Sequence, residues 1–61
     1  MENTSTKIGA QIKQLRLAAG MTQRELAQRI NVGNTTLSQY ESGARVPSDE
    51  VKLKIAMVFG V

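Results

Sequence analysis

The spacing of apolar residues predicts four helical segments. Those of the first segment recur three or four positions apart, on one face of a helix; they are Ile8, Ile12, Leu15 and Ala19. Thr4 or Thr6 is placed to cap the start of this helix, and Gly20 stands where a left-handed residue ends one. No stretch alternates for long between apolar and polar residues, as a half-buried strand would.

The stretch MTQREL carries the clearest sign of a helix start. Thr22 and Glu25 have the spacing of a capping box, in which each side chain accepts from the backbone N–H of the other residue. Met21 and Leu26 are placed for a hydrophobic staple across the same turn. We therefore expect a second helix to begin at Gln23.

A short turn and a third helix follow. The second helix should bury Leu26, Ala27 and Ile30 and stop at Asn31, because Asn tolerates the left-handed conformation. Gly33 serves as N-cap of the third helix, Leu37 and Tyr40 form its inner face, and Gly43 closes it.

Ser48 is placed to cap a fourth helix. Asp49 and Glu50 follow in its first turn, where negative charge suits the helix dipole. The inner stripe of this helix ends before Gly60 and consists of Val51, Ile55, Val58 and Phe59.

The second and third helices have the features of a helix-turn-helix motif, in which two short helices cross steeply. Ala27 supplies a small residue where they meet, and Asn31 supplies a turn residue that tolerates positive φ. Apolar residues are available to fix both helices to the rest of the domain; they are Leu26, Ile30, Val32, Leu37 and Tyr40. The sequence therefore predicts an all-α fold, a compact bundle of four short helices around this motif.

Composition narrows the function. The 61 residues make one small domain, with residues 1–5 expected to be frayed and residues 6–61 folded. The chain has no Cys and no His, so we expect neither a metal site nor a cofactor. Without these residues no set of catalytic groups can be assembled. An enzyme is therefore the weakest interpretation. No apolar run approaches the ~18 residues of a membrane span, and the polar N-terminus is not a signal peptide. We expect a cytoplasmic protein whose net charge of +3 suits a polyanionic partner.

The outer face of the third helix consists of amides and hydroxyls that weaken a helix. Asn34, Thr35, Ser38 and Gln39 are exposed in the helical projection, with Thr36 and Ser42 at the margins. The Asn, Thr and Ser residues among them are each roughly 0.5 kcal/mol worse than Ala in a helix, but such amides and hydroxyls match the donors and acceptors of base edges in the DNA major groove. An ordinary solvated surface is the alternative.

The stretch MTQRELAQRINVGNTTLSQYESGARVPS resembles the phage repressor and Cro-like helix-turn-helix family, also called Xre or lambda-repressor-like. The resemblance extends from about Lys7 to Val61. It implies a sequence-specific DNA-binding transcriptional regulator, most often a repressor, that acts as a homodimer on a double-stranded operator. Some members of the family work as antitoxins or bind proteins, and this alternative stays open.

The resemblance implies particular roles at matching positions. Asn34, Thr35 and Gln39 occupy base-contacting positions, with Ser38 beside them. Candidates for contacts to DNA phosphates are Gln23, Arg24, Thr36, Ser42 and Arg45. Relatives often pair an Arg late in the first helix with a Glu late in the third, which here implies a structural ion pair between Arg16 and Glu41.

The chain departs from the family pattern at several positions. Asn31 replaces the usual Gly of the turn, Gly33 replaces a Ser or Thr cap, and Lys52 stands where relatives are often apolar. Relatives typically continue into a fifth helix, which is absent here, so we expect the chain to be the N-terminal piece of a longer regulator. Leu53 and Met57 are expected to form a second apolar face for the missing partner.

Overall fold

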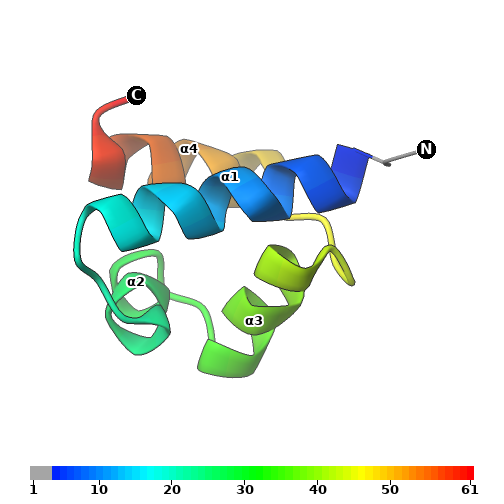
Figure 1. Ribbon diagram of the computed structural model, residues 1–61, viewed down its shortest axis with the longest axis horizontal. Helices are drawn as coiled ribbons and strands as arrows, with labels where there is room; N and C mark the ends of the chain where they lie inside the picture. Colours follow the sequence, from blue (N-terminus) through cyan, green and yellow to red (C-terminus); the bar gives the residue numbers. More distant parts are fainter. Residues whose placement is uncertain (1–3) are drawn as a thin grey trace.

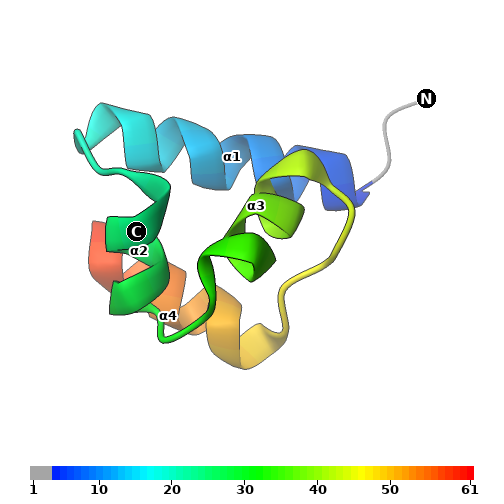
Figure 2. The ribbon, with the colours of Figure 1, turned by 90° about the horizontal axis from the view of Figure 1, so that it is seen from below.

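Four helices lie where the apolar pattern predicts them. The computed structural model describes residues 4–61, and their side chains from Thr6 onward. The helices are α1 (Thr4–Ala18), α2 (Gln23–Arg29), α3 (Asn34–Ser42) and α4 (Asp49–Phe59), with no strand in this part of the chain. In Figures 1 and 2, α1 and α4 run in the same general direction, and α2 and α3 lie together to one side of α1. The prediction of an all-α bundle is confirmed.

The first helix starts earlier than its sequence suggested. Thr4 and Thr6 both lie inside α1, so neither is its N-cap, and the helix includes the last two residues of the segment expected to be frayed. Residues 1–3 of that segment lie outside the described residues. Ala19 is exposed and does not continue the buried stripe. Gly20 has φ +69°, and the Met21 N–H donates to Arg16 O at 3.0 Å, which closes the helix as expected.

The capping box of α2 is confirmed. The Glu25 N–H donates to Thr22 Oγ1 at 3.1 Å, and the Thr22 N–H donates to Glu25 Oε1 at 3.1 Å. Hydrogen bonding of the Glu25 carboxylate to Thr22, most of all to the backbone N–H, lowers the pKa of Glu25. Met21 is half-buried against the core that contains Leu26.

The turn between α2 and α3 depends on Asn31. The last regular residue of α2 is Arg29, and Ile30 is its C-cap. Asn31 has φ +58°, and among the described residues no other non-glycine residue has positive φ. The Val32 N–H then donates to Ala27 O at 2.9 Å. The left-handed residue is therefore where the sequence predicted it.

All four helices contribute to one hydrophobic core. Its fully buried centre is formed by Leu26, Ile30 and Leu37, and each such side chain contributes roughly 1.5–3 kcal/mol through burial. Ala27 is buried beside them, as the close approach of α2 and α3 requires. The remaining buried apolar residues are Ile12, Tyr40 and Ile55.

The C-terminal end of α3 lies directly against α1 at Gly9. A Cβ atom at Gly9 would lie 2.2 Å from Tyr40 O and 2.8 Å from Glu41 O. A Cβ atom at Gly43, the left-handed C-cap of α3, would lie 3.1 Å from Thr6 Cα. The end of α3 is therefore held against α1, whereas its beginning projects away from α1 at the bottom of Figure 1.

The fourth helix has the predicted caps and two apolar surfaces. The Val51 N–H donates to Ser48 Oγ at 3.2 Å, and Gly60 ends the helix with φ +69°. Ile55 is buried, and the other members of the inner stripe are partly buried against the core. Leu53 and Met57 are 62% and 74% exposed on the outside, as expected.

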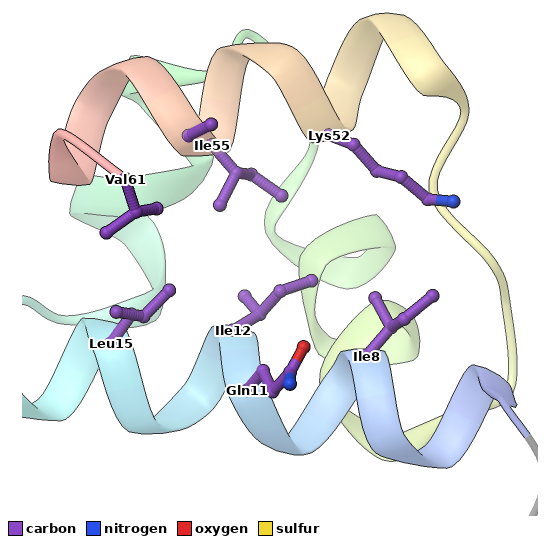
Figure 3. A pocket seen from close by; sticks show the side chains of 8 residues that line it. Ile8, Gln11, Ile12, Leu15, Lys52, Ile55 and Val61 are labelled. Atoms are coloured by element: carbon purple, nitrogen blue, oxygen red, sulfur yellow. The ribbon is translucent and has the colours of Figure 1, made fainter.

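A shallow apolar groove separates α1 from α4 (Figure 3). Its volume is about 190 Å³, and Ile8, Ile12 and Leu15 of α1 lie across it from Ile55 and Val61. Lys52, at a position often apolar in the family, contributes its side chain to the rim. None of the helices described in this chain is both long enough and apolar enough to cross a membrane.

Candidate nucleic-acid interface

The third helix presents an open, uncharged polar surface. Asn34, Thr35, Ser38 and Gln39 are all exposed, and we call these four residues the reading face. Leu37 and Tyr40 on the opposite side of α3 are buried. The residues predicted to contact bases therefore share one accessible surface of a helix that is fixed from behind.

An ion pair connects α3 to α1. Arg16 Nε donates to Glu41 Oε2 at 2.7 Å, and Arg16 Nη2 donates to Glu41 Oε1 at 3.1 Å. The Arg16 and Glu41 side chains are only 9% and 4% exposed. This bidentate geometry fixes the direction of the guanidinium as well as its distance. The two residues that relatives often pair are thus brought together here.

The same cluster also reaches the start of α2. Gln23 Nε2 donates to Glu41 Oε1 at 3.0 Å, and Arg16 Nη1 donates to Met21 O at 2.9 Å. Burial by itself would raise the pKa of Glu41, but hydrogen bonds from Arg16 and Gln23 outweigh it and hold the pKa below 4.5. The charges of Arg16 and Lys13 act in the same direction. Glu41 is therefore a carboxylate at the junction of α1, α2 and α3.

The residues predicted to contact phosphates have different surroundings. Arg24 and Arg45 are exposed, and neither forms an ion pair with any described side chain. Thr36 is half-buried beside the reading face. Gln23 is half-buried, and its amide is already engaged by Glu41. The two arginines are thus free to approach a polyanion, while Gln23 is held in place.

The Ser42 hydroxyl has a structural partner that sequence reasoning did not foresee. Ser42 Oγ donates to Gln39 O at 3.1 Å and accepts from the Ala44 N–H at 3.4 Å. These bonds add to those that Gln39 O accepts from the Ala44 and Arg45 N–H groups, at 3.0 and 3.3 Å, where α3 ends. A Ser directly before a helix-ending Gly was the available signal for this cap.

Two further features were missed from the sequence. Gly9 lies inside the predicted first helix and was given no role, although an isolated Gly in a helix often marks a close backbone approach. The Gln23–Glu41 bond joins residues 18 positions apart, and nothing in local spacing indicated it.

The described side chains also contain no cluster of three or more acidic, His or Cys residues suited to a metal ion.

A tight turn between two short helices, the second with an exposed polar face, defines a helix-turn-helix domain. The family described as "Helix-turn-helix" matches residues 12–61. The chain belongs to this family, in its phage repressor and Cro-like branch. This is a family of DNA-binding regulator domains and not an enzyme family.

Similar proteins come from bacteria, animals and fungi. The chain is 39% identical over 54 residues to "HTH-type transcriptional regulator ImmR" of Bacillus subtilis, covering 88% of this chain and 42% of that protein. It is 38% identical over 55 residues to "Endothelial differentiation-related factor 1 homolog" of Gallus gallus, covering 90% and 37%. It is 37% identical over 54 residues to "Multiprotein-bridging factor 1" of Eremothecium gossypii, covering 88% and 36%. The chain therefore spans about two fifths of the length of these relatives.

Proposed function

We propose that this domain binds specific sequences of double-stranded DNA, with α3 in the major groove, and thereby regulates transcription as a repressor. The observation that carries this proposal is the reading face, whose amides and hydroxyls are exposed while Leu37 and Tyr40 fix the helix from behind. The similarity to a protein named as a transcriptional regulator supports it.

The chemistry of the reading face suits direct readout of bases. Asn34 and Gln39 carry amides that can bond to adenine through two hydrogen bonds, and Ser38 can donate or accept. The methyl group of Thr35 can contact the methyl group of thymine. Because the face has no charge, it discriminates by hydrogen-bond pattern and shape, whereas charged contacts would bind all sequences alike.

Contacts to the DNA backbone set the docking position. The residues assigned to phosphates are Gln23, Arg24, Thr36, Ser42 and Arg45. Arg24 and Arg45 supply charge, and the amide and hydroxyl side chains supply directional bonds. The Ser42 hydroxyl reaches a phosphate by rotating away from Gln39 O.

A homodimer is the arrangement that gives such a small domain adequate specificity. One module of this kind covers about 600–1,000 Å² of protein surface on DNA. Two copies on half-sites about 34 Å apart double the number of bases read. Occupancy of such an operator then blocks transcription from it.

Selection of bound duplexes from random DNA tests the proposal, and symmetric half-sites are the expected result. On the selected site, Gln39→Ala should change the preferred base, with a loss of about 1–3 kcal/mol in discrimination. Gln23→Ala should weaken binding to all sequences alike, because a phosphate contact carries no sequence information. Gln28→Ala, the same change at an exposed position of α2, is the control and should bind like the wild type. The reverse pattern for positions 39 and 23 would disprove the docking geometry.

A second candidate function is protein interaction, as an antitoxin or a bridging factor. The exposed Leu53 and Met57 on α4 favour it, as does similarity to a protein named as a multiprotein-bridging factor. Leu53→Ser would then abolish partner binding, and DNA binding would show neither sequence preference nor strong salt dependence. The two functions use different surfaces of the domain. Gln39→Ala on α3 therefore tests DNA binding, and Leu53→Ser on α4 tests protein binding.

A further inference from the structure

The side-chain amide of Gln23 is held in the free protein by a carboxylate of another helix. Gln23 Nε2 lies 3.0 Å from Glu41 Oε1, and Gln23 is half-buried. Glu41 is itself immobilised, because its two oxygens also accept from Arg16 Nη2 at 3.1 Å and from Arg16 Nε at 2.7 Å. The position of the amide is therefore determined by the junction of three helices.

This arrangement leaves part of the amide available. A primary amide has two N–H donors and one acceptor oxygen, and Glu41 takes one of the donors. A long unrestrained side chain loses rotamer freedom when a ligand fixes it, which weakens binding. At Gln23 much of that freedom has already been removed by an intramolecular bond.

We propose that Glu41 is a positioning residue that holds the Gln23 amide in the orientation that contacts a DNA phosphate. The inference rests on the proposed function and gives Glu41 a role beyond its pairing with Arg16. The Glu41 carboxylate then fixes both the orientation of α3 and the position of the Gln23 amide at the start of α2. It also explains how an acidic side chain is tolerated near DNA, since Glu41 is 4% exposed and lies against a guanidinium.

Removal of the carboxylate alone would leave the buried Arg16 without a negatively charged partner. The variant Arg16→Met/Glu41→Met avoids this problem, because replacing a buried ion pair by apolar residues of similar size often keeps or raises stability. It removes one positive and one negative charge, so the net charge of +3 does not change. Gln23 loses its acceptor, and long-range attraction to DNA stays the same.

The affinity for a mixed-sequence DNA duplex at low salt is the first measurement. The Arg16→Met/Glu41→Met variant should bind about three- to tenfold more weakly than the wild type, the effect of releasing one long side chain. In a Gln23→Ala background the same two substitutions should weaken binding clearly less, because only their effect on the orientation of α3 remains. Gln28→Ala is again the matched control on α2.

NMR relaxation of the side-chain NH₂ groups is the second measurement, and it needs no DNA and no variant. We expect the Gln23 amide of the free wild-type protein to be as rigid as the backbone and the exposed Gln28 amide to be mobile. In the Arg16→Met/Glu41→Met variant the Gln23 amide should become as mobile as that of Gln28.

The outcomes separate this inference from the proposed function. A mobile Gln23 amide in the wild type overturns the inference whatever the DNA result. An equal loss of affinity with and without Gln23 also overturns it, although DNA binding then stands. A wild-type protein that binds no duplex in a salt-dependent way disproves the proposed function, and the inference falls with it.

Discussion

At the scale of single residues, Gly9 limits how closely α3 can pack on α1. In an ordinary helix interior, Gly→Ala would stabilise by about 1 kcal/mol. At Gly9 the added Cβ would lie 2.2 Å from the Tyr40 carbonyl oxygen, and a backbone atom cannot move aside as a flexible side chain would. This close contact should therefore make Gly9→Ala destabilising rather than stabilising.

We expect Gly9→Ala to lower the free energy of unfolding by about 1–3 kcal/mol, the usual cost of overpacking. Urea denaturation followed by circular dichroism measures it. Gly33→Ala is the control for steric contact, because a Cβ there has its nearest neighbour, Thr36 Oγ1, at 3.8 Å; its cost should be limited to the weaker N-cap that Ala gives α3. A Gly9→Ala protein as stable as the wild type would show that α3 does not approach α1 as described.

The carboxylate of Glu41 should make stability depend on pH. Burial alone would raise its pKa in the folded protein, but hydrogen bonds from Arg16 and Gln23 and the charges of Arg16 and Lys13 outweigh burial and lower the pKa. A group with a lowered folded pKa stabilises above its unfolded pKa, here near 4.5, and that stabilisation is lost as the pH falls through the folded pKa. Acid should therefore destabilise the domain.

We expect Glu41→Gln to cost about 3–5 kcal/mol at neutral pH, because Arg16 is left buried without a counter-charge. The difference from the wild type should shrink as the pH falls below 4.5 and toward the lower pKa of the folded protein, where the wild-type carboxylate becomes protonated. Free energies of unfolding measured from pH 7 to acid test this. The pKa of Glu25 is also lowered, in the capping box, so the free energy of unfolding of the Glu41→Gln variant should still depend partly on pH. Parallel curves for the two proteins would contradict the assignment.

At the scale of elements, α3 combines weak local propensity with strong tertiary support. Its outer residues favour a helix less than Ala would, and Gly33 gives it no side-chain cap. Buried Leu37 and Tyr40, the Arg16–Glu41 pair and the left-handed Gly43 compensate. The reading face is thus free to be chosen for chemistry rather than for helix formation.

Ser38→Ala tests this separation of roles. Ala should raise stability by about 0.5 kcal/mol, which corresponds to roughly 2–4 °C in Tm for a domain of this size. The same change should weaken binding to the selected site. Thermal denaturation and DNA titration of one protein give both results. A gain in stability without any loss of specific binding would show that Ser38 makes no contact with the bases.

At the scale of the whole molecule, the net charge of +3 is small for a protein that binds a polyanion. Affinity should therefore depend on a few placed cations rather than on a general positive field. The exposed Arg24 and Arg45, which form no ion pair within the described residues, are the strongest candidates.

We expect the logarithm of the binding constant to fall linearly with the logarithm of salt concentration. Arg24→Gln and Arg45→Gln should each reduce that slope by about 1 while leaving the preferred sequence unchanged. Lys54→Gln, a charge change on α4 beside Glu50, serves as control and should leave the slope unaltered. An arginine variant with an unchanged slope would exclude that arginine from contact with phosphates.

The sequence by itself determined the positions of the helices, the caps of α2, α3 and α4, and the turn. These features depend on residues close together in the chain, as in the Thr22–Glu25 box, the left-handed Asn31 and the buried spacing of Leu37 and Tyr40. The predicted start of α1 was wrong, because Thr4 and Thr6 are each suited either to cap a helix or to continue one. The reading face followed from helical periodicity, but its contact with DNA stays a prediction.

Only the tertiary structure decided how the helices meet. The approach of Tyr40 O to Gly9 and the bond from Gln23 to Glu41 join residues far apart in the chain, and no local spacing encodes them. The Arg16–Glu41 pair was expected only by resemblance, and its bidentate geometry and burial came from the fold. Local free energy selects helices, whereas packing of distant side chains selects the orientation in which α3 is presented.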